Sequence, residues 1–384
     1  MSQLVNTGRG RAPRILHLTH DNMFIARLSG YLEQVLPGSS DFVILITGEV
    51  FKHPVKGRLL AATPSVDEIL ALVSSKVNQY DYFVVHYLIP EWADLIPSVE
   101  KSVRVIWSGF GGDYYGSDIS PDDGILAPLT AELVGSWAPK LRITGRIAQK
   151  LAGYRQGSPK RRAVKRVDAF SAPVPTDLKI MRARYSQFRG DYVQLSYATS
   201  EESAGDALNP TGENILVGNS ASPSNNHLDV FEQLAGAKDP GRKVLVPLSY
   251  GEPQVYREAI IAAGVKHFGE DFVPILDFMP LDDYNRLISS CSFVIMGHRR
   301  QQGLGNILAA LLSGSTLILD RANPVHEYLS QLGVRLTTLD DLSHRTIQET
   351  RLEPDDVIAN RALVEQSWAR STVLENLRNT FNAS

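Results

Sequence analysis

The residues best suited to bind an anion form the stretch Gly297-His-Arg-Arg-Gln-Gln-Gly-Leu-Gly-Asn306. An apolar run precedes this stretch and an apolar helical pattern follows it, which predicts a loop between a buried strand and a helix. Ligands of doubly wound sheets bind at such loops, where backbone N–H groups and the helix dipole favour phosphate. We therefore predict a phosphate site that uses Arg299, Arg300, Gln301, Gln302, Gly303, Gly305 and Asn306. The alternative is a tight turn that carries a solvated arginine pair.

A second polar turn follows the first expected strand of the same half of the chain. Its residues Gly218, Asn219 and Ser220 are small or polar and suit a diphosphate or a sugar. The alternative is an ordinary turn that caps the next helix. The loops after two later strands hold Tyr250, Gly251 and Met279, which could enclose a base and a ribose.

Three expected strand ends in the first half of the chain carry histidine or aspartate. They hold His20 with Asp21, His86, and Asp113 in the run Trp107-Ser-Gly-Phe-Gly-Gly-Asp113. Either residue type can act as the base that makes an alcohol nucleophilic. Carboxyl ends of parallel strands share one edge of a sheet, so we predict that these side chains converge on a cleft. The alternative for each is a helix cap or a satisfied polar group at a strand end.

Residues 139–167 contain ten lysines or arginines and no acidic residue. Apolar residues between them give a rough helical stripe, which is typical of segments that lie on an anionic membrane surface. A solvated basic face and a nucleic-acid patch are the alternatives. Because no nucleic-acid motif is recognised, we expect no nucleic-acid partner and predict membrane contact through Arg146, Lys150, Arg161, Arg162, Lys165 and Arg166.

Strand and helix patterns alternate twice along the chain, which predicts two parallel sheets flanked by helices. The first series runs from the strand pattern at 14–19, and the second from 214–218 to 315–319. A polar stretch at 196–213 separates them. We expect an α/β fold of the GT-B type, in which two doubly wound Rossmann-like domains face each other across a cleft. The expected boundaries are 1–205, 206–350 and, for C-terminal helices that cross back to the first domain, 351–384.

The length, charge and composition of the chain agree with the predicted pair of α/β domains. A chain of 384 residues exceeds what one hydrophobic core usually supports. The net charge of only −3 means that attraction to phosphate must come from a local patch. The single cysteine, Cys291, lies in an apolar run and is expected to be a buried thiol. No metal-binding motif, secretory signal or membrane-spanning stretch is recognised, and we expect no required metal cofactor.

Several of these runs resemble those of glycosyltransferase family 56, the N-acetylfucosamine transferases of enterobacterial common antigen assembly. The runs are Ile215-Leu-Val-Gly-Asn-Ser220, Asn225-Asn-His227, Val246-Pro-Leu-Ser-Tyr250, Arg300-Gln-Gln-Gly-Leu-Gly305 and Asn323-Pro324. The resemblance is good over 214–342, and it adds Asn323 to the expected donor site. In the first domain it is thinner, and the Gly109-Phe-Gly-Gly turn before Asp113 is longer than in the family.

The resemblance implies a TDP-sugar donor and a lipid-linked (undecaprenyl diphosphate) saccharide acceptor. It also implies a peripheral enzyme at the cytoplasmic face of the bacterial inner membrane. Arg300 would stabilise the leaving diphosphate, and Asp113 or His86 would be the base if the reaction inverts the anomeric centre. The alternatives are a GT-B transferase or epimerase with another nucleotide-sugar and a soluble acceptor, or a non-catalytic nucleotide-sugar-binding module.

Overall fold

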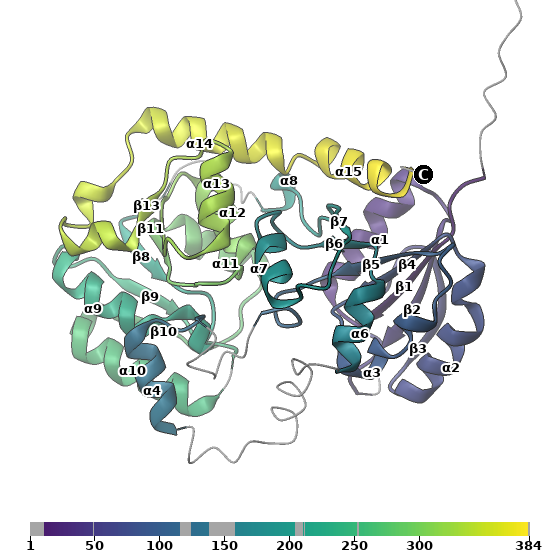
Figure 1. Cartoon of the computed structure of the whole chain (residues 1–384). Helices are drawn as coiled ribbons and strands as arrows, with labels where there is room; N and C mark the ends of the chain where they lie inside the picture. The colour runs from purple at the N-terminus through teal and green to yellow at the C-terminus, as the bar shows by residue number, and fades with distance from the viewer. Residues whose placement is uncertain are drawn as a thin grey trace, which may run out of the picture.

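The protein has two α/β lobes, each built on one parallel sheet (Figure 1). The structure, a computed structural model, describes residues 11–48, 50–115, 124–137, 158–203, 210, 212–251 and 253–382. All strand pairs within both sheets are parallel. The predicted pair of doubly wound domains is therefore confirmed.

The first sheet has the strand order β3-β2-β1-β4-β5-β6-β7. Its strands are β1 (Ile15–His20), β2 (Ser40–Leu45), β3 (Arg58–Thr63), β4 (Tyr82–His86), β5 (Arg104–Ser108), β6 (Ala169–Ser171) and β7 (Asp191–Tyr192). The helices of this half are α1 (Met23–Val35), α2 (Val66–Lys76), α3 (Pro90–Ala93), α4 (Pro128–Trp137), α6 (Pro159–Arg166), α7 (Asp177–Arg184) and α8 (Ser200–Ser203). Alternate residues of β4 enter separate apolar clusters on the two faces of the sheet, as expected for a buried strand covered on both sides.

The second sheet has the order β10-β9-β8-β11-β12-β13. Its strands are β8 (Asn214–Val217), β9 (Val244–Pro247), β10 (Phe272–Ile275), β11 (Cys291–Met296), β12 (Thr316–Leu319) and β13 (Thr337–Thr338). Its helices are α9 (His227–Ala237), α10 (Gln254–Phe268), α11 (Leu281–Ser289), α12 (Leu304–Ser313), α13 (Pro324–Gln331) and α14 (Pro354–Ser367), and α15 (Arg370–Asn382) follows.

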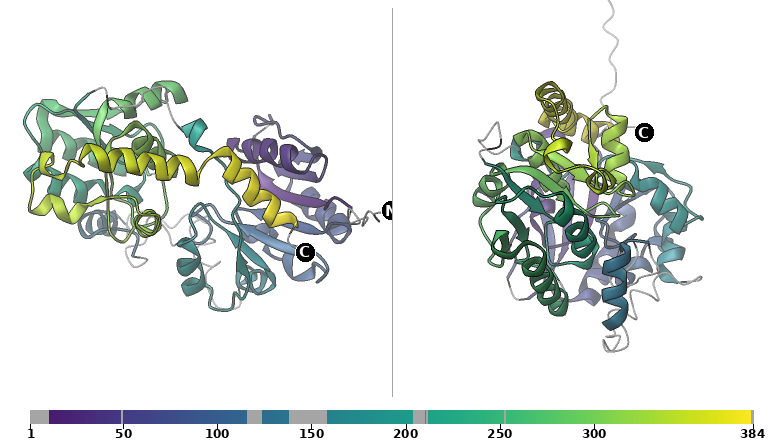
Figure 2. Two further views of the ribbon diagram at one scale, coloured as in Figure 1. Left: turned by 90° about the horizontal axis from the view of Figure 1, so that it is seen from above. Right: turned by 90° about the vertical axis from the view of Figure 1, so that its left-hand side faces the viewer.

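The two lobes exchange helices, so the chain does not divide cleanly near residue 205. Helix α4 packs on α9 of the second lobe, where Leu133 and Trp137 cover part of its apolar core. The Asp229 side chain of α9 accepts hydrogen bonds from the backbone N–H groups of Leu129 and Thr130 and so caps α4. In the other direction, α15 packs on α1 of the first lobe, and α14 and α15 run across both lobes (Figure 2).

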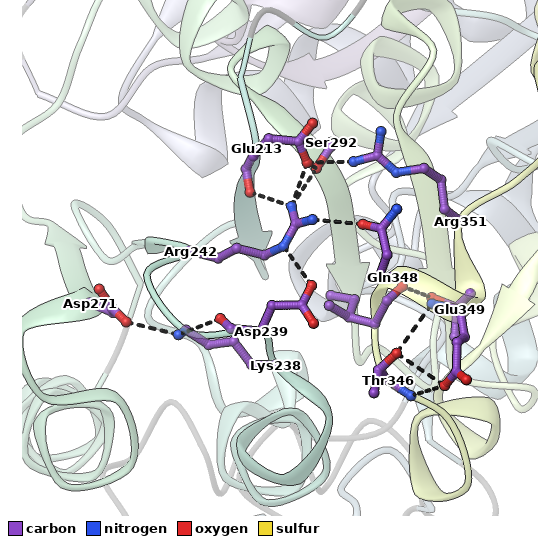
Figure 3. A network of polar contacts seen from close by, with 12 residues as sticks. Glu213, Lys238, Asp239, Arg242, Asp271, Ser292, Thr346, Gln348, Glu349 and Arg351 are labelled. Carbon is purple, nitrogen blue, oxygen red and sulfur yellow. Dashed lines mark hydrogen bonds and ion pairs between the residues drawn. The ribbon is translucent and has the colours of Figure 1, made fainter.

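A charged network closes the amino edge of the second sheet, opposite the strand ends that concern function (Figure 3). The guanidinium of Arg242 donates to Asp239, Glu213 and Gln348. Arg351 reaches the same Glu213 carboxylate. Arg242 and Arg351 each place a guanidinium 5.3 Å from the centroid of the Phe293 ring. These charges have partners within the fold, so the network stabilises the lobe.

Other details differ from the sequence expectations in instructive ways. Strand β3 was not predicted, because it is an edge strand with an exposed start and lacks a continuous apolar run. The helical tail is broken at Trp368 into α14 and α15. Cys291 is buried as predicted, and burial raises the pKa of its thiol to about 12. Among the described residues, no helix is both long and apolar enough to cross a bilayer.

Candidate active site

In each lobe the strand order fixes one point at which a ligand is expected to bind. In a doubly wound sheet, ligands bind beyond the carboxyl ends of the strands where the order reverses. That point lies between β1 and β4 in the first sheet and between β8 and β11 in the second. The loops after β8 and β11 are the two glycine-containing turns predicted from the sequence, and those after β1 and β4 begin next to His20 and His86.

The turn after β8 depends on Gly218. Its φ is +70°, and an added Cβ would lie 2.7 Å from both Asn225 Oδ1 and His227 Nε2. Only glycine fits this conformation and this space. The turn then directs the Asn219 backbone N–H to Asn225 Oδ1 at 2.8 Å. The β8 loop is thus folded onto its own side chains, with Asn219 and Ser220 both buried.

Hydrogen bonds tie three loops of the second lobe into one cluster. Asn219 Nδ2 donates to the Tyr250 hydroxyl at 3.1 Å, and Gln302 Nε2 donates to Asn219 Oδ1 at 3.1 Å. His298 Nε2 lies 2.8 Å from Asn225 Oδ1 and 3.1 Å from Asn219 Oδ1. Burial lowers the pKa of His298 to about 3, so the ring is neutral and its proton is on Nε2 between two acceptors. His298 therefore positions the two asparagines.

Arg300 and the start of α12 form the cationic side of this cluster. Arg300 is half-buried, and its Nε donates to Gln302 Oε1 at 2.9 Å, which fixes the guanidinium beside the loop. Helix α12 begins after Gly303 at φ +65°, and no side chain caps it. Its first N–H groups and the exposed Gly305 are therefore available to an anion. The ring of Tyr250, whose hydroxyl accepts from Asn219, is exposed.

Several residues that were predicted to bind the donor sugar nucleotide have other roles in the structure. Arg299 donates from Nε to Asp320 at 2.9 Å. Asn323 is buried and caps α13 through the Val325 N–H. Asn306 donates to the Tyr284 hydroxyl at 2.8 Å. Gly251 packs against the backbone of Ala221, where an added Cβ would lie 2.7 Å away. The half-buried Met279 makes none of the cluster's hydrogen bonds.

Comparison with known families agrees with this geometry. Residues 159–360, more than half of the chain, match the family model described as 4-alpha-L-fucosyltransferase, glycosyl transferase group 56. The chain belongs to this family. The matched region contains the whole cluster around Gly218, Tyr250 and Arg300. The group 56 protein is thus a glycosyltransferase.

Solved structures that resemble this group 56 transferase share its fold at low sequence identity. HepE of Anabaena, solved in complex with UDP, has a TM-score of 0.63 at 12% identity, covering 97% of this chain and 100% of that one. Sucrose-phosphate synthase from Thermosynechococcus elongatus has a TM-score of 0.61 at 12% identity, with coverage of 97% and 100%. A trehalose 6-phosphate synthase from Burkholderia multivorans has a TM-score of 0.62 at 10% identity, with 97% and 96% covered. These enzymes have the GT-B fold, which confirms the predicted fold class.

Asp113 does not point into the cleft of the group 56 transferase, and that prediction is wrong. Its side chain is buried and accepts hydrogen bonds from Trp107 Nε1 at 2.7 Å and from the N–H groups of Leu88 and Phe110, each at 2.9 Å. Lys160 Nζ donates to the Asp113 carbonyl. Burial raises the pKa of Asp113, and the charge of Lys160 opposes this shift. The carboxyl group joins the loops after β4 and β5, and it has no access to a substrate.

The side chains of His86 and Asp21 also bond to other residues of the first lobe. His86 is fully buried, with Nε2 3.0 Å from His17 Nδ1 and Nδ1 3.2 Å from the Tyr197 hydroxyl. Burial lowers its pKa well below the usual range. Asp21 accepts from the N–H groups of Lys52 and His53, which holds the loop after β2. The prediction that His86 points into the cleft is therefore wrong, and Asp21 is a loop anchor.

His20 is the predicted candidate that remains. It ends β1 at the expected ligand-binding point of the first sheet, is half-buried, and packs between Tyr87 and Trp92 at ring distances of 5.8 and 4.8 Å. Burial lowers its pKa, so the ring is neutral at pH 7 and can accept a proton. Tyr87 has the unusual φ of +60°, a strained conformation that often accompanies functional sites.

Because Asp113 is buried, replacing it should affect stability, whereas replacing a catalytic base should affect turnover. An Asp113→Asn variant would offer one acceptor oxygen to three donors and would turn an NH₂ group toward an N–H. Each buried group left unsatisfied costs about 1–3 kcal/mol, so we expect a clear drop in unfolding free energy with nucleotide affinity retained. Urea denaturation and calorimetry measure the two. Unchanged stability with lost turnover would restore Asp113 as the base.

The basic segment is only partly described by the structure. Arg146 and Lys150 lie outside the described residues, as do three more of its ten cations, Lys140, Arg142 and Arg155. On α6, Arg166 Nη1 pairs with Asp168 at 2.6 Å and Nη2 donates to backbone carbonyls, while Arg161 donates to the carbonyl of Arg184. These contacts argue against membrane-facing roles for Arg161 and Arg166. Lys165 is exposed, and the exposed Arg162 pairs with Asp94.

Three residues of the candidate donor site are not among those predicted from the sequence. His298 and Asn225 lie inside the quoted motifs, and their signal was a buried strand end followed directly by hydrogen-bonding side chains. Tyr115, whose hydroxyl accepts from the Gln301 N–H at 3.1 Å, comes from the other lobe, and no local pattern indicates that contact. Within the described parts of the chain, no group of three or more acidic, histidine or cysteine residues could hold a metal ion.

Proposed function

We propose that this glycosyltransferase moves a deoxy-amino sugar resembling N-acetylfucosamine from a TDP-sugar to a lipid-linked saccharide. The acceptor would carry undecaprenyl diphosphate, and the reaction would serve bacterial surface polysaccharide assembly. The observation that carries the proposal is the cluster of Asn219, Tyr250, Arg300 and Gln302 at the expected ligand-binding point of the second sheet, beside the uncapped start of α12. The HepE complex with UDP supports a nucleotide donor in a protein of this fold.

The proposed mechanism assigns the donor to the second lobe and the acceptor to the first. As the bond from the sugar to the diphosphate breaks, negative charge grows on the leaving oxygen. Arg300 and the N–H groups at the start of α12 would stabilise that charge without a required metal. His20 would accept the proton of the acceptor hydroxyl if the reaction inverts the anomeric centre.

A nucleotide-release assay tests this proposal. TDP- and UDP-linked sugars are each incubated with the protein, with and without an undecaprenyl diphosphate-linked saccharide, and free nucleotide is measured. We expect TDP release that requires the acceptor. Conversion of the donor without nucleotide release would indicate an epimerase. Binding without either reaction would indicate a non-catalytic module, and release with a soluble acceptor alone would contradict the lipid-linked acceptor.

We further propose that residues 139–157 hold the enzyme at the cytoplasmic face of the inner membrane. Near an anionic surface each lysine or arginine contributes about 1 kcal/mol. Changing Lys140, Arg142, Arg146, Lys150 and Arg155 to glutamate should therefore abolish co-sedimentation with phosphatidylglycerol liposomes at low salt. These positions avoid the α6 arginines that bind their own lobe. Equal sedimentation of wild type and variant would contradict the membrane role.

A further inference from the structure

The loop after β5 in the first lobe contacts the donor loop of the second lobe. Tyr115 lies at the end of the described part of this loop and is buried. Its hydroxyl accepts the backbone N–H of Gln301 at 3.1 Å. Gly111 of the same loop lies against Gln301, since an added Cβ would be 3.5 Å from the Gln301 carbonyl oxygen. Gln301 stands between Arg300 and Gln302, the two donor-loop side chains that are bonded to each other.

A buried carboxyl group holds the Tyr115 hydroxyl in place. Tyr115 donates to Asp177 Oδ1, and Tyr114 donates to Asp177 Oδ2 at 2.7 Å. Asp177 begins α7 and is fully buried. Burial raises the pKa of Tyr115 well above its usual range, so the hydroxyl keeps its proton and directs it to Asp177. The oxygen lone pairs are thereby turned toward Gln301.

The same part of α7 is attached to the second lobe. Thr176, the residue before Asp177, donates from Oγ1 to the Pro324 carbonyl at 2.7 Å. The Asp177 support therefore sits next to a second contact between the lobes. Tyr114, in contrast, packs edge-on against Trp107 and Phe170 in the core of the first lobe. The two tyrosines share one carboxylate, and only Tyr115 is seen to contact the donor loop.

We propose that Tyr115 is a positioning residue for the donor: from the first lobe, it fixes the Gln301 backbone and thereby the placement of Arg300 and Gln302. This inference rests on the proposed function for its effect on nucleotide binding. The contact itself can be tested without a ligand. Donor affinity then depends on a residue of the acceptor lobe that acts through the backbone of the donor loop.

Tyr115→Phe and Tyr114→Phe form a matched pair for the test. Each removes one buried hydroxyl and one hydrogen bond to Asp177, so both should lower the melting temperature. Only Tyr115→Phe leaves the Gln301 N–H without its acceptor. We expect calorimetry to show about tenfold weaker binding of TDP or UDP for Tyr115→Phe, from one unsatisfied N–H, and a change of less than about twofold for Tyr114→Phe.

Hydrogen–deuterium exchange of residues 297–303 without nucleotide separates this inference from the proposed function. Tyr115→Phe should speed exchange there, and Tyr114→Phe should not. If the wild type binds no nucleotide and the exchange still differs, the proposed function fails and the positioning role stands. If both variants lose stability and neither changes exchange or affinity, Tyr115 is only a core residue. Should Tyr115→Phe not fold, 3,5-difluorotyrosine at position 115 keeps the shape and weakens the acceptor oxygen, and the same substitution at position 114 is its control.

Discussion

Replacing Arg300 with methionine should weaken nucleotide binding about ten- to a hundredfold and slow transfer a further hundredfold or more. Loss of a hydrogen bond from a charged group costs about 1.5–3 kcal/mol, which accounts for the change in affinity. The larger effect on rate follows because charge on the diphosphate increases as the sugar leaves. Removing one preorganised donor to such charge typically costs about 10²–10³-fold in rate. Calorimetry with TDP and single-turnover transfer measure the two effects separately.

The adjacent Arg299 provides the control. It carries the same charge one residue away, but its guanidinium is paired with Asp320. Arg299→Met should therefore lower nucleotide affinity far less than Arg300→Met. Both variants remove one positive charge, so a general loss of electrostatic attraction would affect them equally. Equal losses would show that the orientation of Arg300 beside Gln302 has no special role.

Replacing His20 with glutamine should lower turnover about 10²–10⁴-fold, the usual contribution of a general base, with nucleotide affinity unchanged. Glutamine keeps a polar side chain of similar size and cannot accept a proton near neutral pH. Because burial lowers the pKa of His20, the unprotonated base persists as pH falls. On the acid side, the wild-type rate should therefore fall to half its maximum below the pKa of an ordinary histidine, about 6.5. Transfer kinetics as a function of pH measure both expectations.

Asp21→Asn is the matched comparison for His20. It changes the next residue, whose carboxylate holds the Lys52 and His53 backbone, so any effect would arise through loop position. We expect a much smaller loss of turnover than for His20→Gln, and no change in the acid limb. Full turnover of His20→Gln would remove the last predicted base. It would favour a retaining reaction, in which the protein supplies no base to the acceptor.

The donor side could be predicted from the sequence because its features are local. Gly218 directly follows β8, whose last three residues are apolar, and the loop from Arg300 to Gly305 begins shortly after β11, which is apolar except for Ser292. Parallel topology brings such strand ends together. The roles of side chains in the first lobe were harder to predict. Asp113 follows a strand as a catalytic carboxylate could, but its burial depends on Trp107, Leu88 and Lys160, which come from three separate segments.

Dependence on distant segments also explains why the positions of helices α4 and α6 could not be predicted. The pattern of α4 shows that it has an apolar face and cannot show which lobe that face covers. The deciding contact is a cap from Asp229, about a hundred residues later in the chain. The sequence pattern of α6 indicates a continuous basic surface, whereas in the structure Lys160 and Arg166 bond to carbonyl groups of neighbouring loops. Long-range hydrogen bonds of this kind leave no periodic trace in a sequence.

The exchange of helices bears on how the protein is made. During synthesis the apolar surface of α1 and of β4 that α15 covers emerges early, and its cover is translated only after the entire second lobe. Helix α4, by contrast, emerges before the α9 surface on which it docks. The first lobe therefore cannot complete its core until the second lobe has been translated. A chain that stops before Arg370 should leave Val373, Leu377 and Phe381 missing from that core, and it should aggregate even though both sheets are intact.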